Sequence, residues 1–463
     1  MQTDACGVRF DRMILTANEL ERAGDRAATA LRRIGIVKGE RVALHSANTP
    51  DLLACLIGLW RIGAVAVPLP LRHPSAVLRA ALESAECRRL LFESHRPPAP
   101  ELTTGIPSDE IPRYRLSDSQ AEPFETWASD RPATLIFTSG STGTPKAAQH
   151  RLSAHVASAR GARANLPFAP GDCWLLSLPL YHVGGLSIMV RTLEARASLA
   201  LPAPSQSTSE ALIELRPTHA SLVPTQLRRL LATPGVSHGL RGILLGGAAA
   251  PDSLVDAALA ATLPIHTTYG LTEMASQVTT TPPDAPRSVL DTSGHVLPER
   301  ELRLSETGEI LVRGATRFDG YVTREGLSCP FDADGWYATG DVGALDSDGR
   351  LRVEGRIDFG FVSGGENVRP EAIERALAQV PGIVQNVVVP VADQEFGSRP
   401  VAFVDAPGWD LNDSRTLEAL RERLDDSLAR FQHPIALMPL PESSGMKPNR
   451  RLLIALAEAH RSQ

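Results

Sequence analysis

Cysteine and lysine are both scarce in this chain of 463 residues. The five cysteines are spread along the sequence with no CxxC pair, which excludes a disulfide framework and a paired-cysteine zinc site and favours a reducing compartment. Only three of the 47 basic residues are lysines: Lys38, Lys146 and Lys447. Lys38 lies in a turn, but the other two lie in glycine-containing loops. Because arginine supplies positive charge elsewhere, these two lysines indicate places that require a compact ammonium.

The chain also lacks an excess of positive charge and a long apolar run. Forty-seven basic and 53 acidic residues give a net charge of −6, which argues against a nucleic-acid partner bound through bulk charge. The longest apolar candidate, residues 52–69, is interrupted by Arg61, and the N-terminus shows no apolar run of a signal peptide. We therefore expect a cytoplasmic protein without stable membrane association.

Apolar segments alternate with amphipathic helical segments through the first part of the chain, which predicts an α/β fold with parallel sheets. Thr16 and Glu19 form a capping-box pattern ahead of the first helix, which Gly35 ends. A second helix is expected over residues 50–62. Further strands are expected at residues 89–93, 134–138, 173–180, 219–225, 242–247 and 264–270, with helices between them, and residues 94–131 are expected to be a loop.

The hydrophobic period changes twice along the chain, and these changes predict the domains. From about residue 287 the pattern alternates with a period of two, which indicates a small β-rich lobe. After Gly355 helices and strands follow as a compact α+β unit. We therefore predict an N-terminal α/β core (1–286), the β-rich lobe (287–355) and an α+β C-terminal domain (356–463).

The segment TSGSTGTPK, residues 138–146, follows an apolar strand and is typical of an anion-binding loop. Its small hydroxyl residues and glycines let backbone N–H groups and hydroxyls converge on a phosphate, and Lys146 adds a charge. It is not a Walker A loop, because Pro145 precedes the lysine and Ala147 follows it. The candidate phosphate ligands are Thr138, Ser139, Gly140, Ser141, Thr142, Gly143 and Lys146.

Together with four later segments, this loop resembles the adenylate-forming superfamily of acyl- and aryl-CoA ligases. The later segments are YGLTE (269–273), GWYATGD (335–341), GRID (355–358) and SGMKPNR (444–450), in the expected order. The resemblance implies ATP, Mg²⁺ and coenzyme A as the bound small molecules. It also implies that a carboxylic acid first forms an acyl-adenylate with release of diphosphate, and that a thiol then displaces AMP.

The resemblance also implies a role for each matched residue. Tyr269 and Gly270 would contact the adenine, Thr272 the α-phosphate, and Glu273 would hold Mg²⁺, as suits a hard oxygen ligand. Asp341 and Arg356 would bind the ribose. Asp358 would be the hinge of the C-terminal domain, whose loop at Gly364 and Gly365 would enter the site for the thioester step, whereas Lys447 would serve adenylation.

Several segments more narrowly resemble the 2-succinylbenzoate–CoA ligases of menaquinone biosynthesis. Examples are LPLYHVGGLSIMVR (178–191), THASLVPTQL (218–227) and VADQEFGSRPV (391–401). The resemblance implies His182 as a gate residue near the acyl pocket and Arg191 as a candidate anchor for the benzoate carboxylate. Gly246, Gly247 and Ala248 would leave room for an aromatic acid, and Gln277 and Thr279 are weaker candidates.

Other interpretations stay open at the level of sequence. The acid could be another aryl or a medium-chain carboxylic acid, or the enzyme could load a carrier protein, although no carrier-domain motif follows Lys447. A non-catalytic nucleotide-binding relative is disfavoured by the intact Lys146, Glu273, Asp341 and Lys447. The sequence leaves the formation of a homo-oligomer open.

Overall fold

The computed structural model describes the chain in separate stretches: residues 14–71, 75–92, 105–107, 129–138, 146–233, 239–425, 427–441 and 449–461. The chain forms two compact units, which are described one at a time below. The first unit consists of residues 1–247, 258–302 and 312–338. The second consists of residues 248–257, 303–311 and 339–463, and so begins its main part ahead of the predicted boundary at residue 356.

The first unit contains an eight-stranded sheet in the order β18-β17-β7-β6-β3-β2-β4-β5. The strands β2, β3, β4, β5 and β6 run parallel, whereas β7 pairs antiparallel with β6 and with β17. These strands are β2 (Arg41–His45), β3 (Val65–Pro68), β4 (Arg89–Phe92), β5 (Gly105–Pro107), β6 (Pro132–Thr138), β7 (Lys146–Arg151), β17 (Gly320–Thr323) and β18 (Gly326–Ser328).

A second eight-stranded sheet of this unit has the order β1-β9-β8-β10-β11-β12-β13-β14 and is parallel from β9 to β12. Its strands are β1 (Ile14–Thr16), β8 (Cys173–Leu175), β9 (Ser198–Ala200), β10 (His219–Leu222), β11 (Gly242–Leu245), β12 (Ile265–Leu271), β13 (Ser276–Thr280) and β14 (His295–Val296). The helices that follow its strands in the sequence include α6 (Val183–Glu194), α7 (Thr208–Leu215), α8 (Pro224–Leu231) and α9 (Asp252–Ala260).

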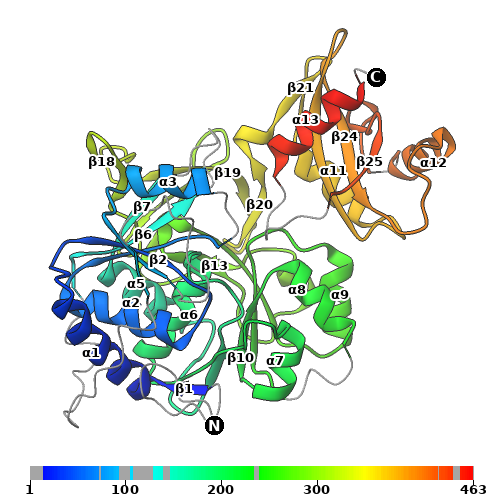
Figure 1. Ribbon diagram of the computed structural model, residues 1–463. Coiled ribbons are helices and arrows are strands. Elements are labelled where there is room, and N and C mark those ends of the chain that lie inside the picture. Colours follow the sequence, from blue (N-terminus) through cyan, green and yellow to red (C-terminus); the bar gives the residue numbers. More distant parts are fainter. Residues whose placement is uncertain are drawn as a thin grey trace. The chain divides into compact units, whose positions relative to one another are not determined.

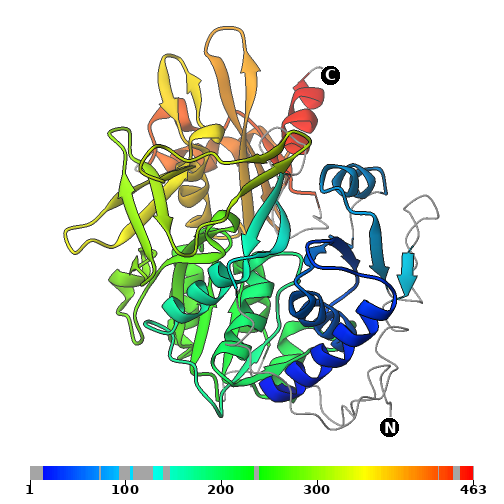
Figure 2. The same ribbon diagram turned by 90° about the vertical axis from the view of Figure 1, so that its left-hand side faces the viewer.

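Helices α1 (Ala17–Arg33) and α2 (Pro50–Ile62) lie side by side at one edge of the first unit (Figures 1 and 2). Two glycines make this close approach possible. A Cβ at Gly24 would lie 2.2 Å from Ile57 Cγ2, and a Cβ at Gly58 would lie 2.8 Å from the backbone N of Ala28. Helices α3 (Ser75–Ser84), α5 (Leu152–Ala162) and α10 (Arg287–Leu290) complete the described helices of the unit.

The remaining strands form two smaller sheets. One has the order β15-β16-β19-β20, with β15 (Arg300–Leu304), β16 (Glu309–Gly314), β19 (Tyr337–Leu345) and β20 (Leu351–Arg356). The other belongs to the C-terminal part and contains β21 (Phe361–Ser363), β22 (Glu366–Val368), β23 (Gln385–Asp393), β24 (Gly397–Asp405) and β25 (Leu437–Pro439). Its helices are α11 (Pro370–Ala378), α12 (Ser414–Leu424) and α13 (Arg450–Arg461).

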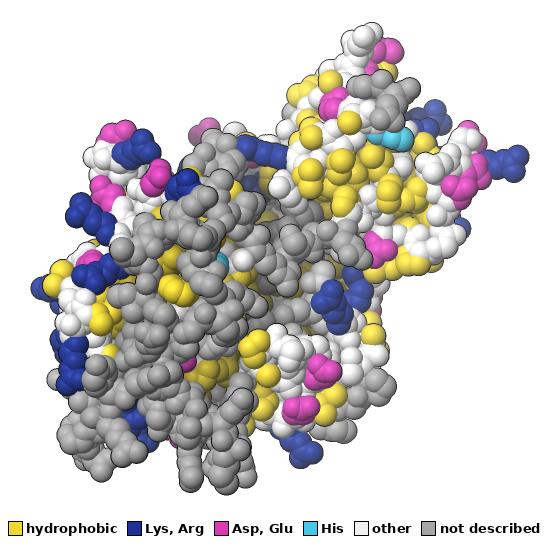
Figure 3. Space-filling model, in the orientation of Figure 1, with side chains coloured by type: hydrophobic (Ala, Val, Ile, Leu, Met, Phe, Trp, Pro, Cys, Tyr) yellow, Lys and Arg dark blue, Asp and Glu magenta, His cyan; other side chains and the backbone are white. Residues whose placement is uncertain are grey.

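Helix α13 buries one side and exposes the other. Leu453 and Ala457 pack against Val389 and Phe403 of the neighbouring sheet. Leu452 and Leu456, one residue earlier in each turn, are exposed. Hydrophobic side chains also gather on the visible face of this part of the molecule (Figure 3). This helix therefore carries two exposed leucines next to its buried apolar face.

The predicted fold class is confirmed, and several strands differ in detail from their expected extents. The segment 173–180 is a strand only at Cys173–Leu175, because the chain then turns at Pro179 toward α6. A short strand, β5, lies within the segment that was expected to be a loop. Strands β14, β17 and β18, from the predicted β-rich lobe, pair instead with strands of the two large sheets. No helix of the described residues is long and apolar enough to cross a membrane.

Candidate active site

The turn between β12 and β13 carries four of the predicted site residues. Strand β12 shows a bulge at Tyr269 and Gly270, where a Cβ on the glycine would lie 2.2 Å from the carbonyl O of Ser276. Thr272 and Glu273 then form a single 3₁₀ turn. The two residues after this turn, Ala275 and Ser276, have φ of 50° and 121°, which are unfavourable for side chains. Such strain persists only where the surroundings fix the backbone, as they do here.

Three contacts hold this turn in place. The carbonyl O of Thr272 accepts a hydrogen bond from Nε2 of His150 at 2.7 Å. The carbonyl O of Glu273 accepts one from the backbone N–H of Phe318 at 2.8 Å. The carboxylate itself accepts one at Oε1 from the hydroxyl of Tyr321 at 2.5 Å. Backbone and side chain of the turn are therefore fixed by residues of β7 and of the segment that leads into β17.

Glu273 is a buried carboxylate for which the described residues provide no ion pair. Among those residues there is also no group of three or more potential metal ligands. This arrangement fits Mg²⁺, which proteins usually hold through one or two carboxylates together with substrate phosphates and water. Glu273 is thus suited to the metal role that the sequence assigned to it.

The candidate phosphate loop joins β6 and β7. Thr138 and Lys146 are paired across these strands and mark the two ends of the loop. Its inner members, Ser139 through Gly143, lie outside the described residues. The ammonium of Lys146 lies 5.2 Å from the centroid of the Tyr321 ring. Burial and the nearby Glu273 charge raise the pKa of Tyr321, so the phenol remains a hydrogen-bond donor.

Helix α6 carries the predicted acid-binding residues His182 and Arg191. His182 is its N-cap residue, with its ring centroid 4.6 Å from that of Tyr181. The chain passes close to itself here, because a Cβ on Gly185 would lie 2.2 Å from the carbonyl O of Pro179. Arg191 lies in the last turn of the helix and is only 3% exposed.

Arg191 reaches from α6 to two other elements. Its Nη2 donates a hydrogen bond to Oε1 of Gln277 on β13, and its guanidinium lies 4.9 Å from the centroid of the Trp174 ring on β8. Its Nε and Nη1 have no hydrogen-bond partner among the described residues, and neither has the buried hydroxyl of Thr279, two residues after Gln277. A buried cation with two unused donors is expensive unless an anion pairs with it.

The electrostatic surroundings of Arg191 are positive. Burial lowers its pKa to about 9, and the charge of Arg300 acts in the same direction. Arg300 is itself buried, but its donors all go to backbone carbonyls and to Ser158, including the carbonyl of Gln277 at 2.6 Å. Arg300 therefore fixes β13, whereas Arg191 has two nitrogen atoms, Nε and Nη1, without a hydrogen-bond partner among the described residues.

The small residues after β11 have different surroundings. A Cβ on Gly246 would lie 2.6 Å from Cγ2 of Thr268, and Gly247 has a φ of +82° with Val223 Cγ1 3.2 Å from its missing Cβ. Each position therefore requires glycine for a local reason besides the predicted room for an aromatic acid. Ala248 belongs to the second unit.

The second unit contains the predicted ribose and hinge residues. Asp341 on β19 lies opposite Arg356 on β20, and Arg356 Nη1 is 2.9 Å from Asp341 Oδ1. The same guanidinium is 3.2 Å from Asp358, so it joins the candidate ribose ligand to the candidate hinge residue. Gly364 and Gly365 form the turn between β21 and β22 with φ of 61° and 89°. Lys447 lies outside the described residues.

Several residues of this site were not anticipated from the sequence. Tyr321, His150 and Trp174 contact Glu273, Thr272 and Arg191, respectively. The segment Asp319-Gly320-Tyr321 carries the only local signal, a glycine ahead of an aromatic residue in a short strand. These contacts join residues far apart in the chain, so a linear motif could not reveal them.

The chain is similar to known proteins over most of its length. Residues 2–322 match the family described as AMP-binding enzyme, and residues 372–443 match its C-terminal domain. The 2-succinylbenzoate–CoA ligase of Escherichia coli is 36% identical over 97% of this chain and 95% of its own. That of Bacillus cereus is 30% identical over 98% and 96%. A Bacillus subtilis structure of o-succinylbenzoate CoA synthetase (MenE) with the acyl-adenylate OSB-AMP has a TM-score of 0.84 and 28% identity, and covers 94% of this chain and 92% of its own.

Proposed function

Because this chain belongs to the AMP-binding enzyme family, we propose that it is an AMP-forming 2-succinylbenzoate–CoA ligase of menaquinone biosynthesis. It joins 2-succinylbenzoate to coenzyme A and converts ATP to AMP and diphosphate through an acyl-adenylate. The relatives named above carry this activity in their names, and the structure with OSB-AMP contains the corresponding intermediate. A further Bacillus subtilis structure holds ATP and a magnesium ion.

The observation that supports this particular acid is the state of Arg191. 2-Succinylbenzoate has two carboxylates, of which the succinyl one reacts and the benzoate one needs an anchor. Arg191 is buried, unpaired with any carboxylate of the described residues, and has free donors at Nε and Nη1. A guanidinium can bind a carboxylate through two parallel hydrogen bonds. The unused donors at Nε and Nη1 lie on the two sides of Nη2, so either of them can bind the benzoate carboxylate together with Nη2, while the bond from Nη2 to Gln277 fixes the orientation.

We assign the nucleotide to the residues around the β12–β13 turn. Tyr269 offers its ring to adenine, Thr272 its hydroxyl to the α-phosphate, and Glu273 an oxygen to Mg²⁺, which when bound would neutralise phosphate charge. The phosphates would receive cationic and backbone hydrogen-bond donors from Lys146, Lys447 and the segment Thr138 to Gly143. Because carboxylate and triphosphate repel each other, these donors lower the barrier to attack on the α-phosphorus.

The two half-reactions require different residues. Asp341 and Arg356 hold the ribose in both steps, whereas Lys447 serves adenylation and the loop at Gly364 and Gly365 serves thioester formation. Asp358 is the hinge about which the domain from residue 356 rotates between them. We assign His182 as the gate residue near the acyl pocket. The four described cysteines are free, which suits a cytoplasmic location.

Substrate selection is tested with matched acids. The wild-type protein should favour 2-succinylbenzoate over 4-oxo-4-phenylbutanoate, the same molecule without the ring carboxylate, in kcat/KM measured by diphosphate release with coenzyme A. Arg191→Ala should raise the KM for 2-succinylbenzoate about tenfold or more, since a hydrogen bond to a charged group contributes roughly 1.5–3 kcal/mol. The same variant should treat 4-oxo-4-phenylbutanoate much as the wild type does.

A control is provided by Arg163→Ala, which removes an exposed arginine paired with Glu194 and should leave both acids unaffected. If benzoate or a medium-chain fatty acid matched 2-succinylbenzoate in kcat/KM, the assignment would fail and a ligase for that other acid would replace it. If the wild type preferred 2-succinylbenzoate but Arg191→Ala behaved like the wild type, the assignment of the acid would be kept and its carboxylate would be bound by another residue.

A further inference from the structure

Tyr321 lies between two residues of opposite charge that the proposed reaction uses. Its hydroxyl donates a hydrogen bond to Oε1 of Glu273 at 2.5 Å, and the ammonium of Lys146 lies 5.2 Å from its ring centroid. We propose that Tyr321 is a positioning residue of the metal–nucleotide site, whose hydroxyl orients the Glu273 carboxylate while its ring face seats the Lys146 ammonium. The proposal rests on the proposed use of ATP with Mg²⁺, and no sequence motif discussed above contains this residue.

The strand register explains why one side chain can serve both partners. Tyr321 on β17 lies opposite Ala148 on β7. Because side chains alternate along a strand, Lys146, Ala148 and His150 share one face of β7, and Tyr321 points to that same face. Lys146, whose ammonium lies near the Tyr321 ring, and His150, which contacts the carbonyl of Thr272, are therefore on the same face as the tyrosine.

The ring cannot easily swing away from this place. Phe318 is fully buried, and its ring centroid is 4.9 Å from that of Tyr321 and 5.3 Å from that of Tyr337, both in edge-on contact. The hydroxyls of Tyr321 and Tyr337 are 2.9 Å apart. Gly320 permits the tight pairing with β18, because a Cβ there would lie 2.4 Å from the carbonyl O of Ser328. The phenol is therefore pre-oriented before any ligand binds.

The chemical consequence concerns the geometry of the carboxylate. A hydroxyl bond to one oxygen of Glu273 fixes the side-chain rotation and leaves the other oxygen to face the metal. Residues that orient a metal ligand in this way commonly change metal affinity by about 10–100-fold when removed. The ring adds a second effect, since a cation held over an aromatic face is attracted to it and loses less freedom on binding phosphate.

The test compares ATP binding with and without Mg²⁺ by isothermal titration calorimetry, in the absence of any acid or coenzyme A. In the wild type, the ratio of the two dissociation constants measures how much the metal contributes. Tyr321→Phe deletes the hydroxyl and keeps the ring, so this ratio should shrink by about tenfold while metal-free ATP binding stays unchanged. Tyr321→Leu removes the ring as well and should weaken metal-free ATP binding in addition.

The matched control is Tyr337→Phe, which deletes the other hydroxyl of the pair and keeps the hydroxyl of Tyr321 that donates to Glu273. Its ratio should stay within about twofold of the wild type. Unchanged or larger metal dependence in Tyr321→Phe would overturn the proposal, and so would an equal loss in Tyr337→Phe. The unfolding temperature of each ligand-free variant shows whether it is folded. Since no acid is present, a wrong assignment of the acid substrate would leave this result intact.

Discussion

Arginine is used in opposite ways around Arg191 in the first unit and around Arg356 in the second. Arg191 is buried and meets no carboxylate among the described residues, and its neighbour Arg300 donates to backbone carbonyls and to the hydroxyl of Ser158. Arg356 is half-exposed and meets two carboxylates, Asp341 and Asp358. Burying a cation without a counter-ion costs free energy, which an anionic ligand can recover when it binds. An exposed ion pair contributes little free energy, so it can break and form again readily. The first arrangement suits binding, and the second suits a hinge.

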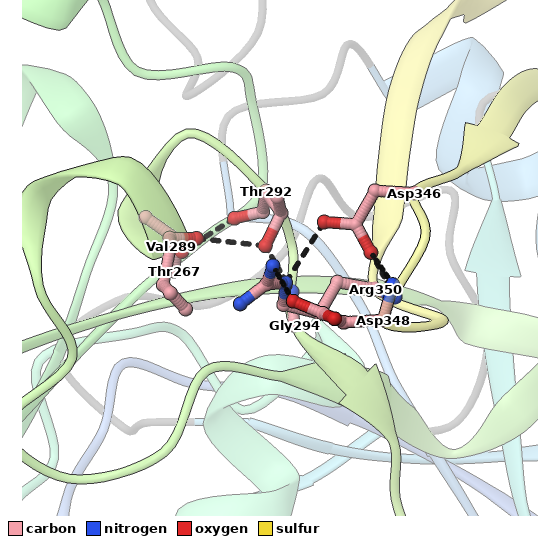
Figure 4. A network of polar contacts seen from close by, with 7 residues as sticks. All are labelled: Thr267, Val289, Thr292, Gly294, Asp346, Asp348 and Arg350. Atoms are coloured by element: carbon pink, nitrogen blue, oxygen red, sulfur yellow. Dashed lines mark hydrogen bonds and ion pairs between the residues drawn. The ribbon is translucent and has the colours of Figure 1, made fainter.

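Figure 4 draws neutral hydrogen bonds of the first unit together with ion pairs of the second. In the first unit, Thr292 is buried, accepts a hydrogen bond at its carbonyl from Thr267 at 2.7 Å and donates from its hydroxyl to the carbonyl of Val289 at 2.7 Å. In the second, Arg350 pairs with Asp346 at 2.8 Å and with Asp348 in a turn at the surface. Neutral buried contacts thus fix strand β12 ahead of Tyr269, while charged exposed contacts shape the turns of the second unit.

The largest expected effect separates the two half-reactions, through residues of the second unit. Lys447→Ala should lower acyl-adenylate formation by about 10²–10³-fold or more, because it removes a cation that bridges two anions in the transition state. Thioester formation from supplied acyl-adenylate and coenzyme A should continue near the wild-type rate. Each half-reaction is measured in single-turnover experiments.

The reverse pattern is expected for Gly365→Leu. This change puts a bulky side chain on the loop at residues 363–367 and at a φ of 89°, so it should slow thioester formation more than adenylation. Arg191→Ala, in contrast, should weaken binding of the acid and so slow adenylation, the half-reaction that uses the free acid. Equal losses in both half-reactions for Lys447→Ala would contradict the assignment of step selection to the second unit.

The next effect in size is a loss of folding stability at acid pH, which arises from His150 in the first unit. Burial lowers the pKa of His150 to about 4, although its bond to the Thr272 carbonyl acts in the other direction. The unfolded chain, with a histidine pKa near 6.5, then binds the proton more readily as the pH falls. The resulting stability is complete above about pH 6.5 and is lost on going down to about pH 4, by roughly 3 kcal/mol.

His150→Gln tests this linkage, since its amide can still donate to the carbonyl of Thr272 but does not titrate. Urea unfolding of the variant between pH 4 and pH 7 should show a shallower loss of stability than the wild type, by about one proton per molecule. Parallel curves for the two proteins would mean that His150 is not the titrating group.

A smaller effect compares the two kinds of arginine directly in the free energy of unfolding. Arg450 donates to both oxygens of Glu374 at 2.7 and 3.0 Å, and these side chains are only 18% and 19% exposed. Arg450→Met should therefore cost about 2 kcal/mol, because it leaves a mostly buried carboxylate without its cation. Arg191→Met should stay within about 1 kcal/mol of the wild type, since it removes a cation that has no carboxylate. A cost for Arg191→Met as large as for Arg450→Met would show that Arg191 is chiefly structural.

The sequence predicted the parts of the fold that depend on local order. Helix α2 has its predicted bounds, and the Thr16–Glu19 capping box forms as expected, because both follow from neighbouring residues. Arg191 was a candidate from its place after His182, but its missing anion and its contact with Gln277 depend on the packing of α6 against β13. Tyr321 was missed because its partner Glu273 lies 48 residues away. Sequence patterns give the ligands of a site more readily than the residues that orient them.

The smallest expected effect belongs to the candidate hinge. Arg356 is 37% and Asp358 41% exposed in their side chains, and the guanidinium keeps Asp341 at 2.9 Å when Asp358 is altered. Asp358→Asn should therefore change the free energy of unfolding by about 0.5 kcal/mol or less, as is typical of an exposed ion pair. Asp341→Asn, whose side chain is only 14% exposed, should cost more and should also raise the KM for ATP. A hinge whose ion pair contributed strongly to stability would resist the rotation that the two half-reactions require. A loss above about 2 kcal/mol for Asp358→Asn, measured by urea unfolding, would thus mean that the pair locks the domain in one position and that the exchange of charged contacts does not drive the switch.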